Sequence, residues 1–304
     1  MTWFLIAIIA PLLYALTNFI DKILLEKYFK QSGTGTIILF SSLLAFFALP
    51  FFLWMDPTVL SVSGKNIFIL CISGILSISI LWCYLKALQN EEASVVIVFY
   101  QLVPVFGYVL GYFILGETLT VMQIISMLII ILGTTIISLE IDSENRFRLR
   151  KKTILPMLAA CLFWASESVI FKAAALEENV WRSLFWEHLM LTVVGILIFV
   201  FIRSYRTNFI AAIRNNSKPV LLLNALNELI YISGNLVLAF SFMLAPVALV
   251  LLVNSFQTIF VLIIGITLTI FFPKVAVEKI QARHIWQKVI AILITGIGTY
   301  LLSI

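Results

Sequence analysis

Long apolar segments separated by short polar connections run through the whole chain. A helix that crosses a membrane needs about 20 mostly apolar residues, and the chain offers ten such segments. They predict transmembrane helices at roughly residues 3–21, 33–54, 66–86, 93–115, 121–139, 154–173, 183–202, 219–241, 246–270 and 285–303. The polar connection at 140–152 divides these helices into two groups of five.

The two groups repeat each other in sequence. LLYALTNFIDK (12–22) aligns with LFWASESVIFK (162–172), and ALQNEEASV (87–95) aligns with AFSFMLAPV (239–247). Because each group has an odd number of helices, the second group enters the membrane from the opposite side, as in transporters built from inverted repeats. We expect an all-α polytopic membrane protein whose ligand site lies between the halves. Its predicted parts are a first five-helix repeat at 1–140, a basic cytoplasmic linker at 141–152 and an inverted second repeat at 153–304.

Composition narrows the class of protein. The 304-residue chain is 62% hydrophobic and 12% charged, whereas a soluble domain carries about 25% charged residues. The sequence has no phosphate-binding GxxxxGK[ST] loop, no HExxH pair and no paired cysteines, so it indicates neither a nucleotide-driven pump nor a metalloenzyme. Cys71, Cys83 and Cys161 fall inside apolar segments, which predicts small buried residues and no disulfide. We therefore expect no enzymatic activity, no cofactor and no bound metal.

Lysine and arginine residues are distributed unevenly over the predicted connections. Of the 20 in the chain, only Lys65, Lys172 and Arg182 fall on the side of the two termini. Because positively charged connections stay in the cytoplasm, both termini are predicted to be extracytoplasmic, in a multi-pass protein of the plasma (inner) membrane. The run RFRLRKK (146–152) would then lie against anionic headgroups of the inner leaflet. The net charge of +5 therefore requires no nucleic acid; the expected partners are the bilayer and a small-molecule substrate, for a monomer or a homodimer.

The order of these motifs resembles the EamA type of the drug/metabolite transporter superfamily. The likeness rests on LLYALTNFIDK and its repeat, on VFYQLVPVFGYVLGYFILGETLT (98–120), and on a glycine in IIILGTTIISL (129–139) that is echoed in ITGIGTYLLSI (294–304). The resemblance implies a ten-helix secondary transporter of small organic molecules, with a cavity lined by the first four helices of each half. Two features depart from the family: the second half has TIFFPKVAV where a Gly-Glu pair would fall, and family members are often drawn with cytoplasmic termini.

The predicted helix at 219–241 carries an unusual polar stripe. Its members are Asn224, Asn227, Glu228, Tyr231 and Asn235. At about 100° per residue they fall within an arc of about 100°, so they share one face. An unpaired charge near the bilayer centre costs at least about 2.5–3.5 kcal/mol, so this face must turn toward protein or a wet cavity. The two interpretations are hydrogen bonding between helices and the wall of a substrate cavity.

Other predicted helices also gather polar and aromatic residues on single faces. In the first helix, Tyr14, Thr17, Asn18 and Asp21 are spaced at i, i+3, i+4 and i+7, which places them on one side. The candidate cavity residues are therefore Tyr14, Asn18, Tyr100, Trp164, Asn224, Asn227, Tyr231, Asn235, Asn254 and Gln257.

The acids that the sequence places inside the membrane are confined to the second half. They are Glu167, Glu187 and Glu228. A carboxyl group in a cavity of low dielectric constant can gain and lose protons near neutrality. We hypothesise that Glu228 or Glu187, with Glu167 as a third candidate, couples transport to protons or binds a cationic group; a structural ion pair or a neutral buried glutamate is the alternative. His188 suggests a proton relay with Glu187, although adjacent residues point about 100° apart and one histidine makes no metal site.

These features together indicate a secondary active transporter of a small organic metabolite or drug-like solute. It would work by alternating access, with protons as the candidate coupling ion. The alternatives are a non-transporting membrane scaffold or subunit, an intramembrane enzyme, and a transporter of a lipid-linked substrate. A cavity lined by the stripe would favour the transporter, since a scaffold would bury the same groups in dry bonds between helices.

Overall fold

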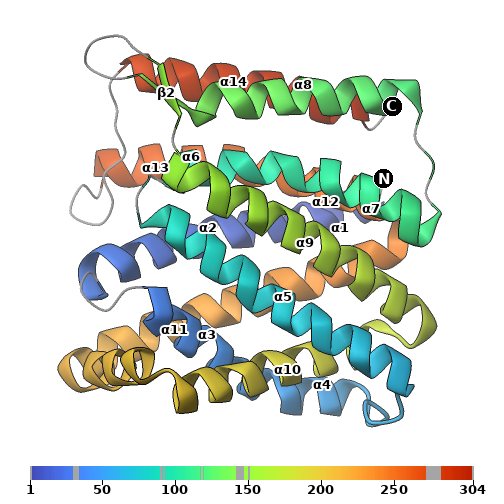
Figure 1. Cartoon of the computed structure of the whole chain (residues 1–304), viewed down its shortest axis with the longest axis vertical. Coiled ribbons are helices and arrows are strands. Elements are labelled where there is room, and N and C mark those ends of the chain that lie inside the picture. Colours follow the sequence, from blue (N-terminus) through green and yellow to red (C-terminus); the bar gives the residue numbers. More distant parts are fainter. Residues whose placement is uncertain are drawn as a thin grey trace.

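The computed structural model describes residues 2–29, 34–89, 91, 93–116, 118, 120–141, 147–149, 151–271 and 282–302. Within these residues, eight helices are long and apolar enough to cross a membrane. They run across the molecule in Figure 1, where the two chain ends lie at the same end of the bundle. An α-helix satisfies its own backbone hydrogen bonds, which is why apolar segments in a membrane take this form.

The first half of the chain is almost entirely helical. Its elements are α1 (Thr2–Ala7), α2 (Ile9–Ile23), a π-helical turn (Leu24–Tyr28), α3 (Thr34–Leu44), a 3₁₀ turn (Ala45–Ala48), α4 (Leu49–Met55), α5 (Gly64–Leu88), α6 (Ala93–Val98), a 3₁₀ turn (Phe99–Leu102), α7 (Val103–Leu115) and α8 (Val121–Ser138). Pro104 lies in the first turn of α7, where its missing N–H interrupts the fourth predicted helix least.

The second half follows a short hairpin. Strands β1 (Leu139–Ile141) and β2 (Phe147–Leu149) pair antiparallel. The helices that follow are α9 (Lys151–Glu177), α10 (Val180–Phe201), α11 (Arg203–Leu244), α12 (Val247–Val253), a 3₁₀ turn (Asn254–Phe256), α13 (Gln257–Phe271) and α14 (Ala282–Leu302). The linker predicted at 141–152 thus contains a strand and the start of α9, while 142–146 and 150 lie outside the described residues.

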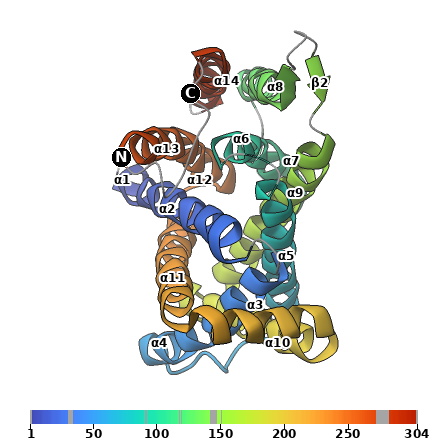
Figure 2. The same ribbon diagram turned by 90° about the vertical axis from the view of Figure 1, so that its left-hand side faces the viewer.

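The eight membrane-length helices coincide with eight of the predicted ones. The other two predicted helices, at 121–139 and 285–303, correspond to α8 and α14. These two pack against each other and lie together on one side of the bundle in both views (Figures 1 and 2).

One connection predicted between apolar segments is helical. Helix α11 is 42 residues long and begins at Arg203, whereas the sequence predicted a helix from 219. Residues 203–217 contain neither glycine nor proline, so no residue in this stretch stops a helix. Pro219 stands where the polar stretch joins the apolar one.

Helices of the two halves pair in a reciprocal pattern. Helix α2 packs against α11 and α13, and α9 packs against α5 and α7. Likewise α3 packs against α11, and α5 against α10. The predicted repeats would make α2, α3, α5, α7 and α8 the counterparts of α9, α10, α11, α13 and α14. Exchanging each helix for this counterpart reproduces the same pairs. The contacts between α3 and α10 and between α8 and α14 join each helix to its own counterpart.

Lys22 and Lys172, which align in the sequence repeat, each bind backbone carbonyl groups at the C-terminal end of a helix. Lys22 donates hydrogen bonds to the carbonyl oxygens of Leu88 (2.9 Å), the last residue of α5, and of Glu91 (2.6 Å), three residues further on. Lys172 donates to the carbonyl oxygen of Ala245 (2.9 Å), beyond the end of α11. Each ammonium group therefore satisfies carbonyls that a helix end leaves without intrahelical partners.

The outer surface of the bundle is apolar. Phe47, Phe113 and Leu155 are each more than 70% exposed. Large apolar side chains at such exposure suit contact with lipid and not with water. The chain is therefore a multi-pass membrane protein.

Candidate functional site

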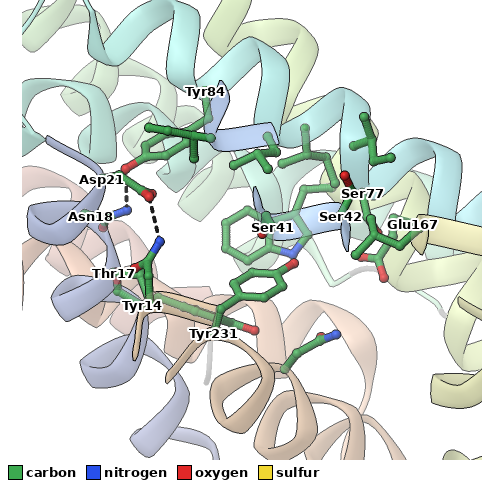
Figure 3. A pocket seen from close by; sticks show the side chains of 18 of the residues that line it. Tyr14, Thr17, Asn18, Asp21, Ser41, Ser42, Ser77, Tyr84, Glu167 and Tyr231 are labelled. Atoms are coloured by element: carbon green, nitrogen blue, oxygen red, sulfur yellow. Dashed lines mark hydrogen bonds between the residues drawn. The ribbon is translucent and has the colours of Figure 1, made fainter. Parts of the chain in front are cut away.

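A cavity of about 110 Å³ lies between the two halves. Helices α2, α3 and α5 contribute walls from the first half, and α9, α11 and α13 from the second. Since a single water needs about 10–15 Å³ of such space, the cavity has room for several waters or one small organic molecule. Figure 3 shows the side chains that point into it.

Most of the cavity residues predicted from the sequence lie in this wall. They are Tyr14, Asn18, Tyr100, Trp164, Asn227, Tyr231, Asn235 and Gln257. Asn224 does not line the cavity; its amide donates to the carbonyl oxygen of Val220 on the same helix, at 2.7 Å. Asn254 is buried in the 3₁₀ turn before α13 and is not part of the wall either.

A chain of hydrogen bonds links amide and phenol groups across the two halves. Gln257 donates to the Asn18 side-chain oxygen at 2.8 Å. Asn18 in turn donates to the Tyr84 hydroxyl at 2.9 Å. Helices α13, α2 and α5 are joined in this way, which fixes the rotation of Asn18 at one end of the cavity.

An acid in the first half corrects one prediction from the sequence. Asp21 lies near the end of α2, is 5% exposed and lines the cavity, so the buried acids are not confined to the second half. Asn227 on α11 donates to its carboxylate at 2.7 Å, a bond drawn in Figure 3. The prediction was wrong because Asp21 falls at the end of an apolar segment, where an acid is usually exposed at the interface.

Glu228 lies beside the cavity and not in its wall. The Ser41 hydroxyl on α3 donates to its carboxylate, and Ser41 itself lines the cavity. Glu228 is 4% exposed, and its other oxygen, Oε1, has no hydrogen-bond partner among the described residues. An acid with one unsatisfied oxygen has an open position for a proton or a ligand donor.

Glu167 and Glu187 share one small cluster. The Ser73 hydroxyl lies 3.5 Å from a Glu167 oxygen and 3.3 Å from a Glu187 oxygen. Ser77 donates to Glu187 at 3.0 Å. Gly74 makes this approach possible, because a Cβ there would lie 2.7 Å from the carbonyl oxygen of Glu187. Glu167 lines the cavity, whereas Glu187 reaches it through Ser77.

His188 points away from this cluster, as the angle between adjacent helical residues predicts. Its Nδ1 lies 2.9 Å from the Leu184 carbonyl oxygen, and its ring packs on Phe52 with centroids 5.0 Å apart. It does not line the cavity. This arrangement gives no support to a proton relay with Glu187.

The candidate cavity residues chosen from the sequence omit several polar residues of the wall. They are Ser41, Ser42, Ser77 and Tyr84, together with Thr17 and Asp21, which the sequence had placed on the same helix face as Tyr14 and Asn18. Serine in an apolar helix usually bonds its own backbone, as Ser42 does to Ile38 at 2.6 Å. Its presence therefore carries little signal in sequence. Among the described residues, no three His, Cys, Asp or Glu side chains gather closely enough to hold a metal ion.

Part of the chain matches the model of a known protein family. Residues 1–139 match the model of the EamA-like transporter family, so the resemblance predicted from the sequence is confirmed over that half. A search of curated proteins found no match. Among solved structures, 28 chains match. One of them, described as "Crystal structure of protein", is 14% identical with a TM-score of 0.50, and the match covers 97% of this chain and 96% of that one; this likeness concerns the fold alone.

Proposed function

We propose that this chain, whose first half is EamA-like, is a secondary active transporter of a small organic metabolite or drug-like solute. The observation that carries the proposal is the cavity itself, which both halves line with polar side chains and buried acids. Ligand sites at the interface between two repeats are typical of secondary transporters. In a scaffold without transport, the same groups would be paired in dry contacts between helices.

The proposed architecture has ten membrane-spanning helices in two inverted repeats, residues 1–140 and 153–304. The reciprocal helix pairs and the matching Lys22 and Lys172 contacts support this arrangement. So does the position of the two chain ends at one end of the bundle. Alternating access would then be a rocking of one half against the other around the cavity. The distribution of lysine and arginine supports extracytoplasmic termini in a plasma (inner) membrane.

The buried acids are the proposed coupling groups. Glu228 and Glu187 each have one carboxylate oxygen without a hydrogen-bond partner among the described residues. Both reach the cavity through a serine that lines it, and Glu167 lines it directly. A proton bound at these carboxyls would be exchanged as the cavity changes its access, since ionisable groups inside membranes mark proton and substrate paths.

Filling the cavity tests the transport proposal. We expect Ser77→Trp to abolish solute counterflow in proteoliposomes, because the indole would occupy the space that the solute needs. Ser79→Trp is the matched control: Ser79 lies two residues along the same helix and does not line the cavity. The solute would come from a thermal-shift screen of metabolites at two pH values. If folded Ser77→Trp protein transports like the wild type, the cavity is not the transport site.

Removing the acids tests the coupling proposal. We expect Glu228→Gln, Glu187→Gln or both to transport solute without the accompanying proton flux, because an amide cannot carry the proton. Glu26→Gln is the control, since Glu26 is exposed and pairs with Lys22 outside the cavity. Proton and solute flux are measured together in proteoliposomes. If Glu228→Gln and Glu187→Gln both keep the wild-type ratio of proton flux to solute flux, neither acid is the coupling group.

A further inference from the structure

The chargeable groups around the cavity are of one sign. Asp21 and Glu167 line it, while Glu187 and Glu228 each bond a serine of its wall. The described residues that line the cavity include no lysine, arginine or histidine. The site can therefore present negative charge to a ligand and has no positive side chain to offer it.

Three basic residues on helices that contribute to the cavity wall have partners outside it. Lys22 donates to backbone carbonyls at the end of α5 and pairs with Glu26 at 3.2 Å. Lys172 donates to the Ala245 carbonyl, and His188 bonds Leu184. A carboxylate buried without a counter-charge is costly in a membrane. Compensation must therefore come from a proton or from a cation that enters the cavity.

A row of aromatic rings runs along the cavity wall. Ring centroids lie 5.8 Å apart between Tyr231 and Tyr14, and 6.1 Å apart between Tyr14 and Trp164. The row continues from Trp164 to Tyr100 (4.8 Å) and from Tyr100 to Tyr84 (6.1 Å). All five rings line the cavity. Their faces carry the negative part of the ring quadrupole, which attracts a cation within about 6 Å of a centroid.

The aromatic rings and the acids lie next to one another in the cavity wall. Trp164 meets both Tyr14 and Tyr100 at interplanar angles of 80° and 83°, so the plane of the indole is nearly perpendicular to both phenol rings. Glu167 follows Trp164 by one helical turn on α9, which places a carboxylate beside this corner. At the other end of the row, Asn18 donates to the Tyr84 hydroxyl at 2.9 Å, and Asp21 lies one helical turn after Asn18 on α2 and lines the cavity.

We propose that the transported solute is a small organic cation, an alkylammonium or quaternary ammonium compound. This inference rests on the proposed function and adds the chemical class of the substrate. The positive group lies against the ring faces, with Asp21 or Glu167 as its counter-charge. The volume of about 110 Å³ suits a cation of about the size of choline or benzylammonium. Such a site excludes anions, because none of the described residues in its wall is a basic side chain that would pair with them.

Pairs of compounds that have nearly the same shape but differ in charge test whether the site selects a positive charge. The purified full chain is titrated with choline, butylammonium and benzylammonium, and with the neutral partners 3,3-dimethylbutan-1-ol, 1-butanol and benzyl alcohol. We expect at least one cation to bind about tenfold or more tightly than its partner, as a cation–π contact reinforced by a carboxylate requires. The proposal is overturned if no cation binds more tightly than its neutral partner.

Variants distinguish this site from attraction to the protein surface. Trp164→Leu and Asp21→Asn are expected to remove most of the preference for the cation, whereas Trp186→Leu and Glu26→Gln keep it. Trp186 donates to the Val59 carbonyl outside the cavity. A preference that is unchanged in both cavity variants overturns the assignment to this site.

Different experimental results would reject the cationic substrate and the transport function. Counterflow of a neutral or anionic solute that Ser77→Trp abolishes would keep the transporter and reject the cation. Saturable, charge-selective binding without counterflow of the bound cation in proteoliposomes would keep the site and reject transport.

Discussion

The two halves of the molecule meet at opposite ends of the bundle through different chemistry. At one end, the connection between α4 and α5 meets the turn between α9 and α10; we call this the polar contact. At the other end, the first turns of α3 meet the N-terminal part of α11; we call this the aromatic contact. The two lie at opposite ends of the helices in Figure 1, and the polar contact is at the end where the chain termini lie.

The polar contact consists of ion pairs and hydrogen bonds. Arg182 lies 3.2 Å from the Asp56 carboxylate, and Asn179 donates to the same group at 2.9 Å. Asn66 donates to Glu177 and Glu178, at 3.0 Å each. Each of these groups can exchange its partner for water at an interface, so the contact is replaceable.

The aromatic contact consists of packed rings. The Phe40 and Phe209 centroids lie 4.6 Å apart, and Phe29 stacks on Phe40 at 6.0 Å. Gly35 lies directly under the Tyr205 ring, where a Cβ would overlap ring atoms. Separation of these closely packed rings loses many dispersion contacts at once, so this end should resist separation more than the polar end.

The two ends of this interface between similar halves are thus stabilised by different interactions. Burial holds the aromatic contact, and it depends little on pH or salt. Charge holds the polar contact, and it depends on both. If rocking opens the cavity at the end with the weaker contact first, the polar contact is the expected point of opening.

The largest effect is expected at the aromatic contact. Phe40 is 2% exposed, and Phe40→Ala should reduce the free energy of unfolding by about 3 kcal/mol, the lower end of the range for buried phenylalanine. We use the lower end because the phenyl ring of the unfolded protein would be surrounded by lipid or detergent and not by water. Its transfer into the packed interior therefore gains less free energy than it would from water. Chemical denaturation in detergent measures it. Phe113→Ala, at a site 77% exposed, is the control, and equal losses in both variants would contradict the packing argument.

A smaller, pH-dependent effect is expected at the polar contact. Hydrogen bonds from Thr58 and Asn179, together with the Arg182 charge, lower the pKa of Asp56 to about 2. Because this pKa is below the unfolded value of about 3.9, the stabilisation is complete above that value and is lost as pH falls through about 2. Asp56→Asn should therefore cost about 1 kcal/mol or less at pH 7.

Denaturation of wild type and Asp56→Asn at pH 7, 4 and 3 checks the sign. The difference between the two proteins should be constant from pH 7 to about pH 5 and should shrink toward pH 3. A difference that grows as the pH falls would contradict the assignment of the charged form of Asp56 to this contact.

The smallest effect is expected at the rim of the polar contact. Lys65 and Glu177 are 3.1 Å apart, but their side chains are 69% and 54% exposed. Lys65→Gln should lower the free energy of unfolding by less than Asp56→Asn does, and high salt should remove what remains. If Lys65→Gln lowers the free energy of unfolding as much as Asp56→Asn does, the exposed fraction of an ion pair does not determine how much it stabilises this contact.

Much of the candidate cavity could be predicted from the sequence, but its hydrogen-bond partners could not. The angles along α11 place Asn227, Tyr231 and Asn235 on one face, and all three line the cavity. The same angles include Asn224, whose amide bonds its own backbone. Helical periodicity identifies a face but does not set its width, because that depends on how closely the neighbouring helices approach.

The sequence by itself determined the membrane class of the chain, the position of most helices and the presence of a polar face. Apolar length settles these features, since a backbone in lipid must bond within its own segment. Tertiary structure decided which polar groups meet. Ser41 reaches Glu228 across 187 residues of sequence, and Asp21 is reached by Asn227 across 206. Such pairs depend on the rotation and spacing of packed helices, which close contacts such as Gly74 against Glu187 determine and no single segment encodes.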